Sequence, residues 1–396
     1  MTPEQRFLLL LILVGGLATV LGLVSKRARM LPYPVVLALA GVLVGLLPGT
    51  PLPHIGAGIL LLAFVPGLIF EAALTLDLAE LRRRLLPVGL LVTVGVALTV
   101  LLIGTLTHLL LGFRWADGML IGAILAATDP IAVVTLLRRI KAPGGLAALL
   151  EGESLLNDGT GVAAFTAVLG TIVAGSPSVT DAGIRFLELT VGGTLIGLAA
   201  GFLGLALLRF AEDAPLEILA TLVIAYGSYL AADIVHASGI VAVVVAGIVV
   251  ARYGASIGKL HGPQLLGFWN LLAFVLNAML FILVGAALPA STLLPVAGLV
   301  VATFVIMVVT RAVPVYGLLA MAALRPPPIP WSWRHVTFWS GLRGALSVAL
   351  ALSVAGMAGV DSRVAVVAYG VVLLSLVVQG GLIAPVTRFV GIKEAV

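Results

Sequence analysis

Long apolar runs separated by short polar loops extend through most of the chain. A membrane-spanning helix needs about 20 mostly apolar residues, and glycine, proline and charged residues mark off thirteen runs of this kind. The pattern predicts an all-α polytopic membrane protein with about thirteen transmembrane helices in a single unit covering residues 1–396. The predicted spans are 7–24, 32–48, 56–76, 86–111, 117–137, 147–174, 184–208, 215–234, 238–251, 265–288, 292–320, 336–356 and 364–386.

Basic residues are distributed unequally between the loops on the two sides of this arrangement. Sixteen fall on one side and four on the other. Because cytoplasmic loops carry the excess of Lys and Arg, we expect the C-terminus inside and the N-terminus outside. We expect a tail of about ten residues after the last span and no cytoplasmic regulatory domain. The sixteen are Lys26, Arg27, Arg29, Arg82, Arg83, Arg84, Arg138, Arg139, Lys141, Arg209, Arg252, Lys259, Arg325, Arg334, Arg388 and Lys393, and the four are Arg6, Arg114, Arg185 and Arg363.

Composition excludes several functional classes. The chain is 61% hydrophobic and 10% charged, whereas roughly a quarter of the residues of a soluble domain are charged. The net charge of +5 lies in short loops, so a nucleic-acid surface is not expected. The chain has no cysteine, no GxxxxGK[ST] phosphate loop and no HExxH motif. We therefore expect neither an enzyme nor an ATP-driven pump, and no cofactor.

Two of the predicted spans carry helix-breaking sequences. Span 117–137 is interrupted by Ala127-Thr128-Asp129-Pro130, and span 336–356 by Gly341-Leu342-Arg343-Gly344. Broken helices at corresponding positions of two halves are typical of transporters built from inverted repeats, where they form the binding site near the bilayer midplane. The sequence therefore predicts two broken helices at an ion or substrate site.

Six ionisable residues fall deep within predicted spans, where each costs at least about 2.5–3.5 kcal/mol on insertion scales. Two arginines can neutralise only two of the four carboxylates, since guanidinium stays protonated and an unpaired buried charge is strongly unfavourable. The two remaining acids are expected to pair with a mobile proton or metal cation. The six are Glu71, Asp129, Glu153, Asp158, Arg311 and Arg343.

Spacing along span 147–174 separates two kinds of carboxylate. Ser154 and Asp158 are four residues apart and share a helix face, as do Glu153 and Asn157 on the adjoining stripe. The first face presents a carboxylate with a hydroxyl, and the second a carboxylate held by an amide. We expect the first pair to bind the ion and the second to be structural.

Asp158, Asp129, Ser154 and Thr128, with backbone carbonyls freed by the helix break, make an all-oxygen cluster that suits Na⁺. Burial favours the protonated carboxyl and a bound cation favours the ionised one, so proton and Na⁺ would exclude each other at Asp158. This predicts exchange of Na⁺ for H⁺, with K⁺ as an alternative cation and a channel or ion sensor as an alternative class. The histidines fall near loops or helix ends, where we expect them to be solvated: His54, His108, His236, His261 and His335.

At these residues the chain resembles the NhaP-type sodium/proton antiporters, the family that includes the eukaryotic sodium/proton exchangers. The motifs are spread over most of the chain in the expected order. They are Phe70-Glu71-Ala72, Ala127-Thr128-Asp129-Pro130, Glu151-Gly152-Glu153-Ser154-Leu155-Leu156-Asn157-Asp158-Gly159, Thr310-Arg311-Ala312-Val313 and Gly341-Leu342-Arg343-Gly344-Ala345.

The resemblance implies thirteen helices arranged as inverted repeats, with the two broken helices crossing in an ion-binding core that moves against a dimerisation domain. It places 86–174 and 291–390 mainly in the core, 1–85 and 210–290 mainly in the dimerisation domain, and 184–208 in a linking helix. A homodimer in a prokaryotic inner membrane is expected, with Na⁺ and H⁺ as substrates and Li⁺ as a further one.

Roles within the site are also implied by the resemblance. Asp158 is expected to be the transport carboxylate, supported by Asp129, Thr128 and Ser154. Glu153 is expected to form a buried ion pair with Arg311 beside Asn157, and Arg343 to be a structural charge facing Glu71. Because Asn157 precedes the transport carboxylate, where electrogenic relatives have a second Asp, electroneutral one-for-one exchange is predicted.

Overall fold

The computed structural model describes residues 15–22, 33–45, 57–175, 178–254, 262–288 and 290–392. In these ranges the chain is helical with no strand, and each of the thirteen predicted ranges contains helix. The N-terminal part of span 7–24 and the residues Arg6, Lys26, Arg27, Arg29, His54, Lys259, His261 and Lys393 lie outside the described residues.

The helices of the first half follow a short helix at 15–22. They are α2 (Tyr33–Gly45), α3 (Ala57–Ala63), α4 (Val65–Thr75), α5 (Leu78–Arg83), α6 (Leu85–Leu90), the π-helix η1 (Leu91–Gly95), α7 (Val96–Leu111), α8 (Trp115–Ile124), α9 (Ile131–Arg139), α10 (Gly144–Val173) and α11 (Val179–Leu208).

The helices of the second half run from α12 to α20. They are α12 (Ala214–Ile234), α13 (Gly239–Gly254), α14 (Pro263–Ala286), α15 (Ala290–Leu293), the 3₁₀ turn η3 (Leu294–Val296), α16 (Ala297–Ala312), the π-helix η4 (Val313–Leu318), α17 (Leu319–Ala322), α18 (Trp331–Trp339), α19 (Ala345–Ser353) and α20 (Arg363–Phe389).

Helix length and hydropathy agree with a membrane protein. Among the described residues, seven helices are long and apolar enough to cross a bilayer, and four shorter apolar helices of 10–17 residues accompany them. Many of their large apolar side chains are exposed, as expected where lipid covers the outer surface.

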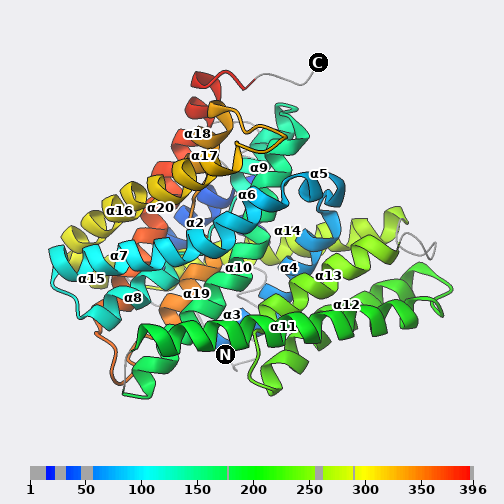
Figure 1. Ribbon diagram of the computed structural model, residues 1–396, viewed down its shortest axis with the longest axis horizontal. Helices are drawn as coiled ribbons and strands as arrows, with labels where there is room; N and C mark the ends of the chain where they lie inside the picture. Colours follow the sequence, from blue (N-terminus) through cyan, green and yellow to red (C-terminus); the bar gives the residue numbers. More distant parts are fainter. Residues whose placement is uncertain are drawn as a thin grey trace.

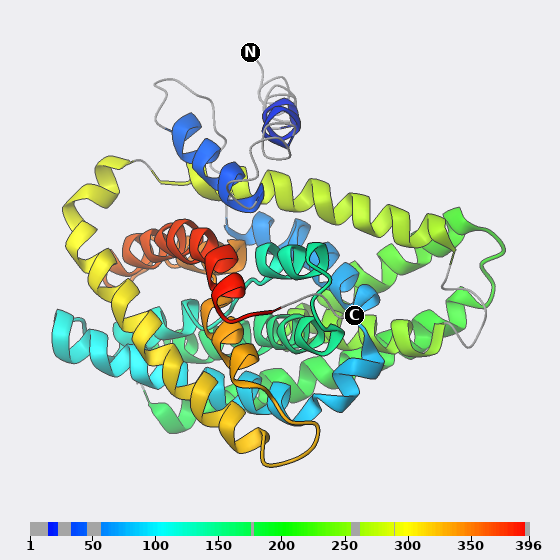
Figure 2. The same ribbon diagram turned by 90° about the horizontal axis from the view of Figure 1, so that it is seen from above.

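Small residues set how closely the helices approach. Gly193, Gly197 and Gly201 follow one another at four-residue spacing on α11, and a Cβ at each would collide with α13. Such small-residue stripes allow helix backbones to pack closely in membranes. In the same way, α2 packs across α14, as Figure 2 shows.

Two spans are interrupted near their centres, as the sequence predicts. The chain leaves α8 at Ile124 and enters α9 at Ile131, and it leaves α18 at Trp339 and enters α19 at Ala345. In Figure 1, α9 and α18 lie toward one end of the molecule and α8 and α19 toward the other. Of these halves, α8 and α19 pack against each other.

Candidate ion-binding site

The interruptions of the two spans are in direct contact. The backbone N–H of Asp129 donates to the carbonyl of Leu342 over 2.8 Å, and the Ser347 hydroxyl donates to the carbonyl of Ile124, also over 2.8 Å. Unwound segments leave backbone polar groups without helical partners, which is tolerated at membrane depth only where other groups satisfy them. Here each interrupted span provides hydrogen-bond partners for backbone groups of the other.

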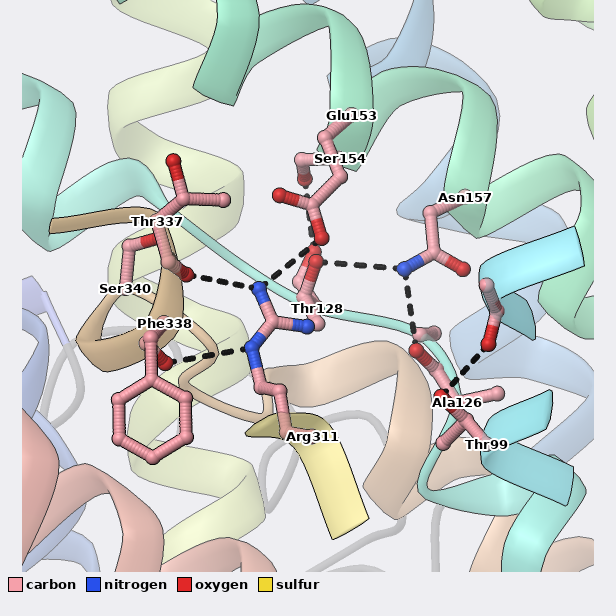
Figure 3. Close-up of polar contacts among 12 residues, drawn as sticks. Thr99, Ala126, Thr128, Glu153, Ser154, Asn157, Arg311, Thr337, Phe338 and Ser340 are labelled. Atoms are coloured by element: carbon pink, nitrogen blue, oxygen red, sulfur yellow. Dashed lines mark hydrogen bonds and ion pairs between the residues drawn. The ribbon is translucent and has the colours of Figure 1, made fainter. Parts of the chain in front are cut away.

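Helix α10 contributes the side chains that bind the first interruption. The Ser154 hydroxyl donates to the carbonyl of Thr128 over 2.7 Å. The Asn157 amide nitrogen donates to the carbonyl of Ala126 over 3.0 Å and to the Thr128 hydroxyl over 3.3 Å. Figure 3 shows these bonds running from α10 to the segment between α8 and α9. Hydroxyl, carbonyl and amide oxygens are therefore collected beside Asp129.

Asp158 and Asp129 are the two carboxylates at this junction. Both are half-buried, and they are close enough to interact electrostatically. Asp129 Oδ1 accepts a hydrogen bond from the backbone N–H of Ile131 over 3.0 Å. Within the described ranges, Asp158 makes neither a hydrogen bond nor an ion pair. Of the two junction carboxylates, that of Asp158 is thus the one without a hydrogen-bond or ion-pair partner among the described residues.

Glu153, in contrast, is neutralised within the protein. Arg311 Nη2 on α16 lies 2.9 Å from Glu153 Oε1, and both side chains are less than a tenth exposed. The same guanidinium donates to the carbonyls of Thr337 over 3.0 Å and Phe338 over 3.2 Å, at the end of α18. Figure 3 shows Arg311 between Glu153 and these two carbonyls. The ion pair therefore joins α10, α16 and the first half of the second interrupted span.

The expected contact between the Glu153 carboxylate and the Asn157 amide is not formed. The Glu153 carboxylate accepts from Arg311, and Asn157 is held by Ala126 and Thr128. Sharing a helix stripe brought Glu153 and Asn157 near each other without making them partners, because each side chain reaches a different neighbouring segment.

Arg343 is fully buried at the second interruption. Its Nη1 donates to the carbonyl of Ala127 over 3.3 Å, and its Nε lies 3.2 Å from the Met307 sulfur. Its backbone N–H donates to the Ser375 hydroxyl over 3.1 Å. The guanidinium therefore lies just beyond the C-terminus of α8, where a positive charge complements the partial negative charge of the helix dipole.

The expected pairing of Arg343 with Glu71 is wrong in this structure. The charged neighbours of Glu71 on α4 are Arg138 and Glu151, which form an ion pair of 2.6 Å between α9 and α10. The resemblance implied a structural charge at Arg343 with a carboxylate facing it. Carbonyls freed by the helix break are the partner instead.

The chain is similar to proteins of known function over nearly its whole length. The family model described as "Sodium/hydrogen exchanger, transmembrane" matches residues 10–389. The chain belongs to the sodium/hydrogen exchanger family. It is 36% identical over 381 residues to the Na⁺/H⁺ antiporter ApNhaP of Aphanothece halophytica, covering 95% of this chain and 73% of the relative. It is 34% identical over 345 residues to the Na⁺/H⁺ antiporter NhaP of Pseudomonas aeruginosa, covering 83% of this chain and 80% of that protein.

A solved structure shares the exchanger fold. The sodium proton antiporter MjNhaP1 of Methanocaldococcus jannaschii superimposes with a TM-score of 0.81, covering 98% of this chain and 100% of that one at 20% sequence identity. The fold class expected from the motifs is therefore confirmed. The family consists of sodium/hydrogen exchangers, so the expectation of a transport protein is confirmed.

A buried acid escaped the sequence analysis of this exchanger. Asp117 in the first turn of α8 is fully buried and accepts hydrogen bonds from Arg114 over 2.5 and 3.0 Å. It also accepts from the backbone N–H of Asp361, so it ties the start of α8 to the loop before α20. Asp361 is itself bound by Arg363, whose hydrogen bond holds the pKa of Asp361 below its usual range. The three-residue spacing of Arg114 and Asp117 was the available signal.

The expectation of a solvated loop histidine is wrong for His335. This residue lies within α18, is half-buried, and forms a hydrogen bond through Nδ1 with the Tyr316 hydroxyl of η4. The apolar run from 336 placed it just before a span, whereas the helix begins at Trp331.

Close approach explains both glycines of the Gly341-Leu342-Arg343-Gly344 segment. A Cβ at Gly341 would collide with the Arg311 guanidinium, and one at Gly344 would lie 2.9 Å from Cγ of Asp129. Glycine is the residue that permits such approaches of backbone to a neighbouring group. The motif thus lets the exchanger pack its second interruption against one residue of the ion pair and one of the two junction carboxylates.

Gly344→Ala is expected to raise the KM for Na⁺ at least about ten-fold, which corresponds to about 1.4 kcal/mol of binding, because the added methyl displaces the Asp129 carboxylate. The measurement is Na⁺-dependent dissipation of a pH gradient in proteoliposomes. Gly381→Ala on α20 is the matched control, since a Cβ there meets open space. Equal KM values for Gly344→Ala and wild type would contradict the placement of Asp129 at the ion site.

Proposed function

We propose that this protein exchanges Na⁺ for H⁺ across the membrane at Asp158, one cation for one proton. The observation that carries the proposal is the contrast between two acids on α10. Glu153 is paired with Arg311, whereas Asp158 is free of hydrogen bonds and ion pairs among the described residues and lies beside Asp129 at the junction of the interrupted spans. The names of the similar antiporters agree with this function.

Competition for one carboxylate gives exchange without covalent chemistry. A carboxylate in a partly desolvated site is stable when it is protonated or when a cation is bound, and not when it is bare. Oxygen ligands suit a hard cation such as Na⁺ or Li⁺, and the junction offers two carboxylates with the hydroxyl oxygens of Ser154 and Thr128 close by. The Asp158 carboxylate therefore carries either a proton or a cation, and it opens to each side of the membrane in turn.

The charges around the site support a one-for-one stoichiometry. Asn157 is an uncharged amide held by two oxygen acceptors. The charge of Arg311 is balanced by Glu153, and that of Arg343 is stabilised by carbonyls at the end of α8. Asp158 thus remains as the carboxylate on α10 that is free to alternate between proton and cation.

The larger arrangement is part of the same proposal. The residues of 86–174 and 291–390 form a core that carries the site, those of 1–85 and 210–290 form mainly the dimerisation domain, and 184–208 links them. The two interrupted spans cross within the core. The protein acts as a homodimer in a prokaryotic inner membrane, surrounded by lipid, with the N-terminus outside and the C-terminus in the cytoplasm, as the loop charges indicate.

Purified protein in liposomes tests this function directly. With an imposed pH gradient and a pH-sensitive dye inside, addition of Na⁺ or Li⁺ is expected to dissipate the gradient, while a voltage-sensitive dye records no Na⁺-dependent potential. Clamping the potential with valinomycin and equal K⁺ on both sides should leave the rate unchanged. A Na⁺-driven potential would contradict one-for-one exchange, and dissipation by K⁺ but not by Na⁺ would identify a K⁺/H⁺ antiporter.

A further inference from the structure

A π-helical turn begins two residues after Arg311. The α-helix α16 ends at Ala312, and η4 occupies Val313–Leu318. A second π-turn, η1, interrupts the helix that runs from Leu85 to Leu111. The two turns pack against each other, and a Cβ at Gly95 of η1 would lie 3.6 Å from both Pro314 and Leu318 of η4. Single π-turns within α-helices are rare and often occur at functional sites.

The turn changes which residues share a face. Arg311 and Tyr316 are five residues apart, which in an α-helix separates side chains by about 140° around the axis. Both nevertheless contact α18. Arg311 donates to the carbonyls of Thr337 and Phe338, and the Tyr316 hydroxyl hydrogen-bonds His335 Nδ1 over 2.5 Å. The wider turn of η4 therefore directs two side chains toward the same helix.

Tyr316 packs against aromatic side chains of α18. Its ring stacks on Trp331 with centroids 5.2 Å apart and lies 5.4 Å from the ring of Phe338. His335 packs edge-on against Trp331 at 4.9 Å. The hydrogen bond between Tyr316 and His335 is thus a second, fixed link between η4 and α18, two residues away from the Thr337 carbonyl that Arg311 binds.

The same helix leads into the ion site. Three residues beyond Trp339, at the end of α18, is Leu342, whose carbonyl accepts the backbone N–H of Asp129. A displacement of α18 would therefore move the carbonyls around Arg311 and the backbone that holds Asp129. Neither Tyr316 nor His335 belongs to the set of oxygen ligands, so their influence on the ion would be indirect.

We propose that Tyr316 and His335 are positioning residues of the cation site, which hold α18 against the π-turn η4 so that Arg311 and Asp129 keep their places. The inference rests on the proposed exchange of Na⁺ for H⁺ at Asp158. Tyr316→Phe removes the hydroxyl and retains the ring, and His335→Ala removes the imidazole. Both should raise the KM for Na⁺ about three- to ten-fold, the range expected for one hydrogen bond, with the maximal rate per folded protein within about two-fold of wild type.

Two features make the test specific to positioning. His335→Asn retains a hydrogen-bonding atom near the place of Nδ1, so it should restore a KM close to wild type. The double variant Tyr316→Phe/His335→Ala should resemble the single variants, since partners in one interaction are not additive. Tyr226→Phe is the matched control, because that hydroxyl donates to the Ala63 carbonyl, away from α18.

Wild-type protein in the same vesicles separates the two ways of failing. If wild type shows no Na⁺-driven exchange, the proposed function is wrong. If wild type exchanges while Tyr316→Phe and His335→Ala keep its KM, or alter only the yield of folded protein, the positioning role is overturned. Additive effects in the double variant would equally overturn it.

Discussion

Asp158→Asn is expected to abolish Na⁺-dependent exchange while leaving the folded protein at least as stable as wild type. The carboxylate makes no hydrogen bond or ion pair with the described residues, so an amide of the same shape removes no contact. It does remove an ionisable group from membrane depth, where such groups are costly. Exchange in proteoliposomes should fall at least about 100-fold, equivalent to about 2.7 kcal/mol of transition-state stabilisation, and the Tm in detergent should not decrease.

Asp181→Asn provides the matched control for this prediction. Asp181 lies exposed in the first turn of α11, so the same chemical change there should leave both exchange and Tm near wild type. Retention of full exchange by Asp158→Asn would remove Asp158 from the transport role. A large drop in Tm would show that Asp158 has a structural partner after all.

Unlike Asp158, the buried Glu153–Arg311 ion pair is expected to contribute strongly to stability. The loss of stability should depend on which of the two residues is replaced. Arg311→Met leaves the Glu153 carboxylate buried without its cation, which typically destabilises a protein by about 3–5 kcal/mol. Glu153→Gln should cost clearly less, because Arg311 keeps its bonds to the Thr337 and Phe338 carbonyls. Thermal or denaturant unfolding of the purified protein in detergent should show this order.

The double variant Glu153→Met/Arg311→Met separates charge from packing. Replacing both members of a buried pair by apolar residues is often neutral or stabilising, so the double variant should recover stability relative to Arg311→Met alone. Should Glu153→Gln prove as damaging as Arg311→Met, the carbonyls of α18 would not be supporting the guanidinium as the structure indicates.

Part of this site was predictable from sequence because its signals are local. Glycine and proline punctuation placed both helix breaks, and the rarity of deep charges pointed to Asp158 and Asp129. The Glu153–Arg311 contact was implied by the family resemblance. The apolar runs likewise located helix in every predicted range. Apart from that contact, these inferences needed only helix periodicity and the energetic cost of charge in lipid.

The remaining features depend on the three-dimensional path of the backbone. The resemblance placed Arg343 opposite Glu71, whereas its guanidinium is bound by a carbonyl freed by the unwound segment, a partner that no sequence motif marks. His335 was placed in a loop because the apolar run begins one residue later, and a π-turn such as η4 has no signature in hydropathy. Asp117 was missed because its burial results from contacts with a loop more than 240 residues away.

The distance along the chain between Glu153 and Arg311 also bears on how the protein is made. The two are 158 residues apart, so a ribosome adding about 5–20 residues per second reaches Arg311 roughly 8–30 seconds after Glu153. Throughout that interval Glu153 has no Arg311 with which to pair. The buried ion pair can therefore form only after the second half of the chain has been synthesised as far as Arg311.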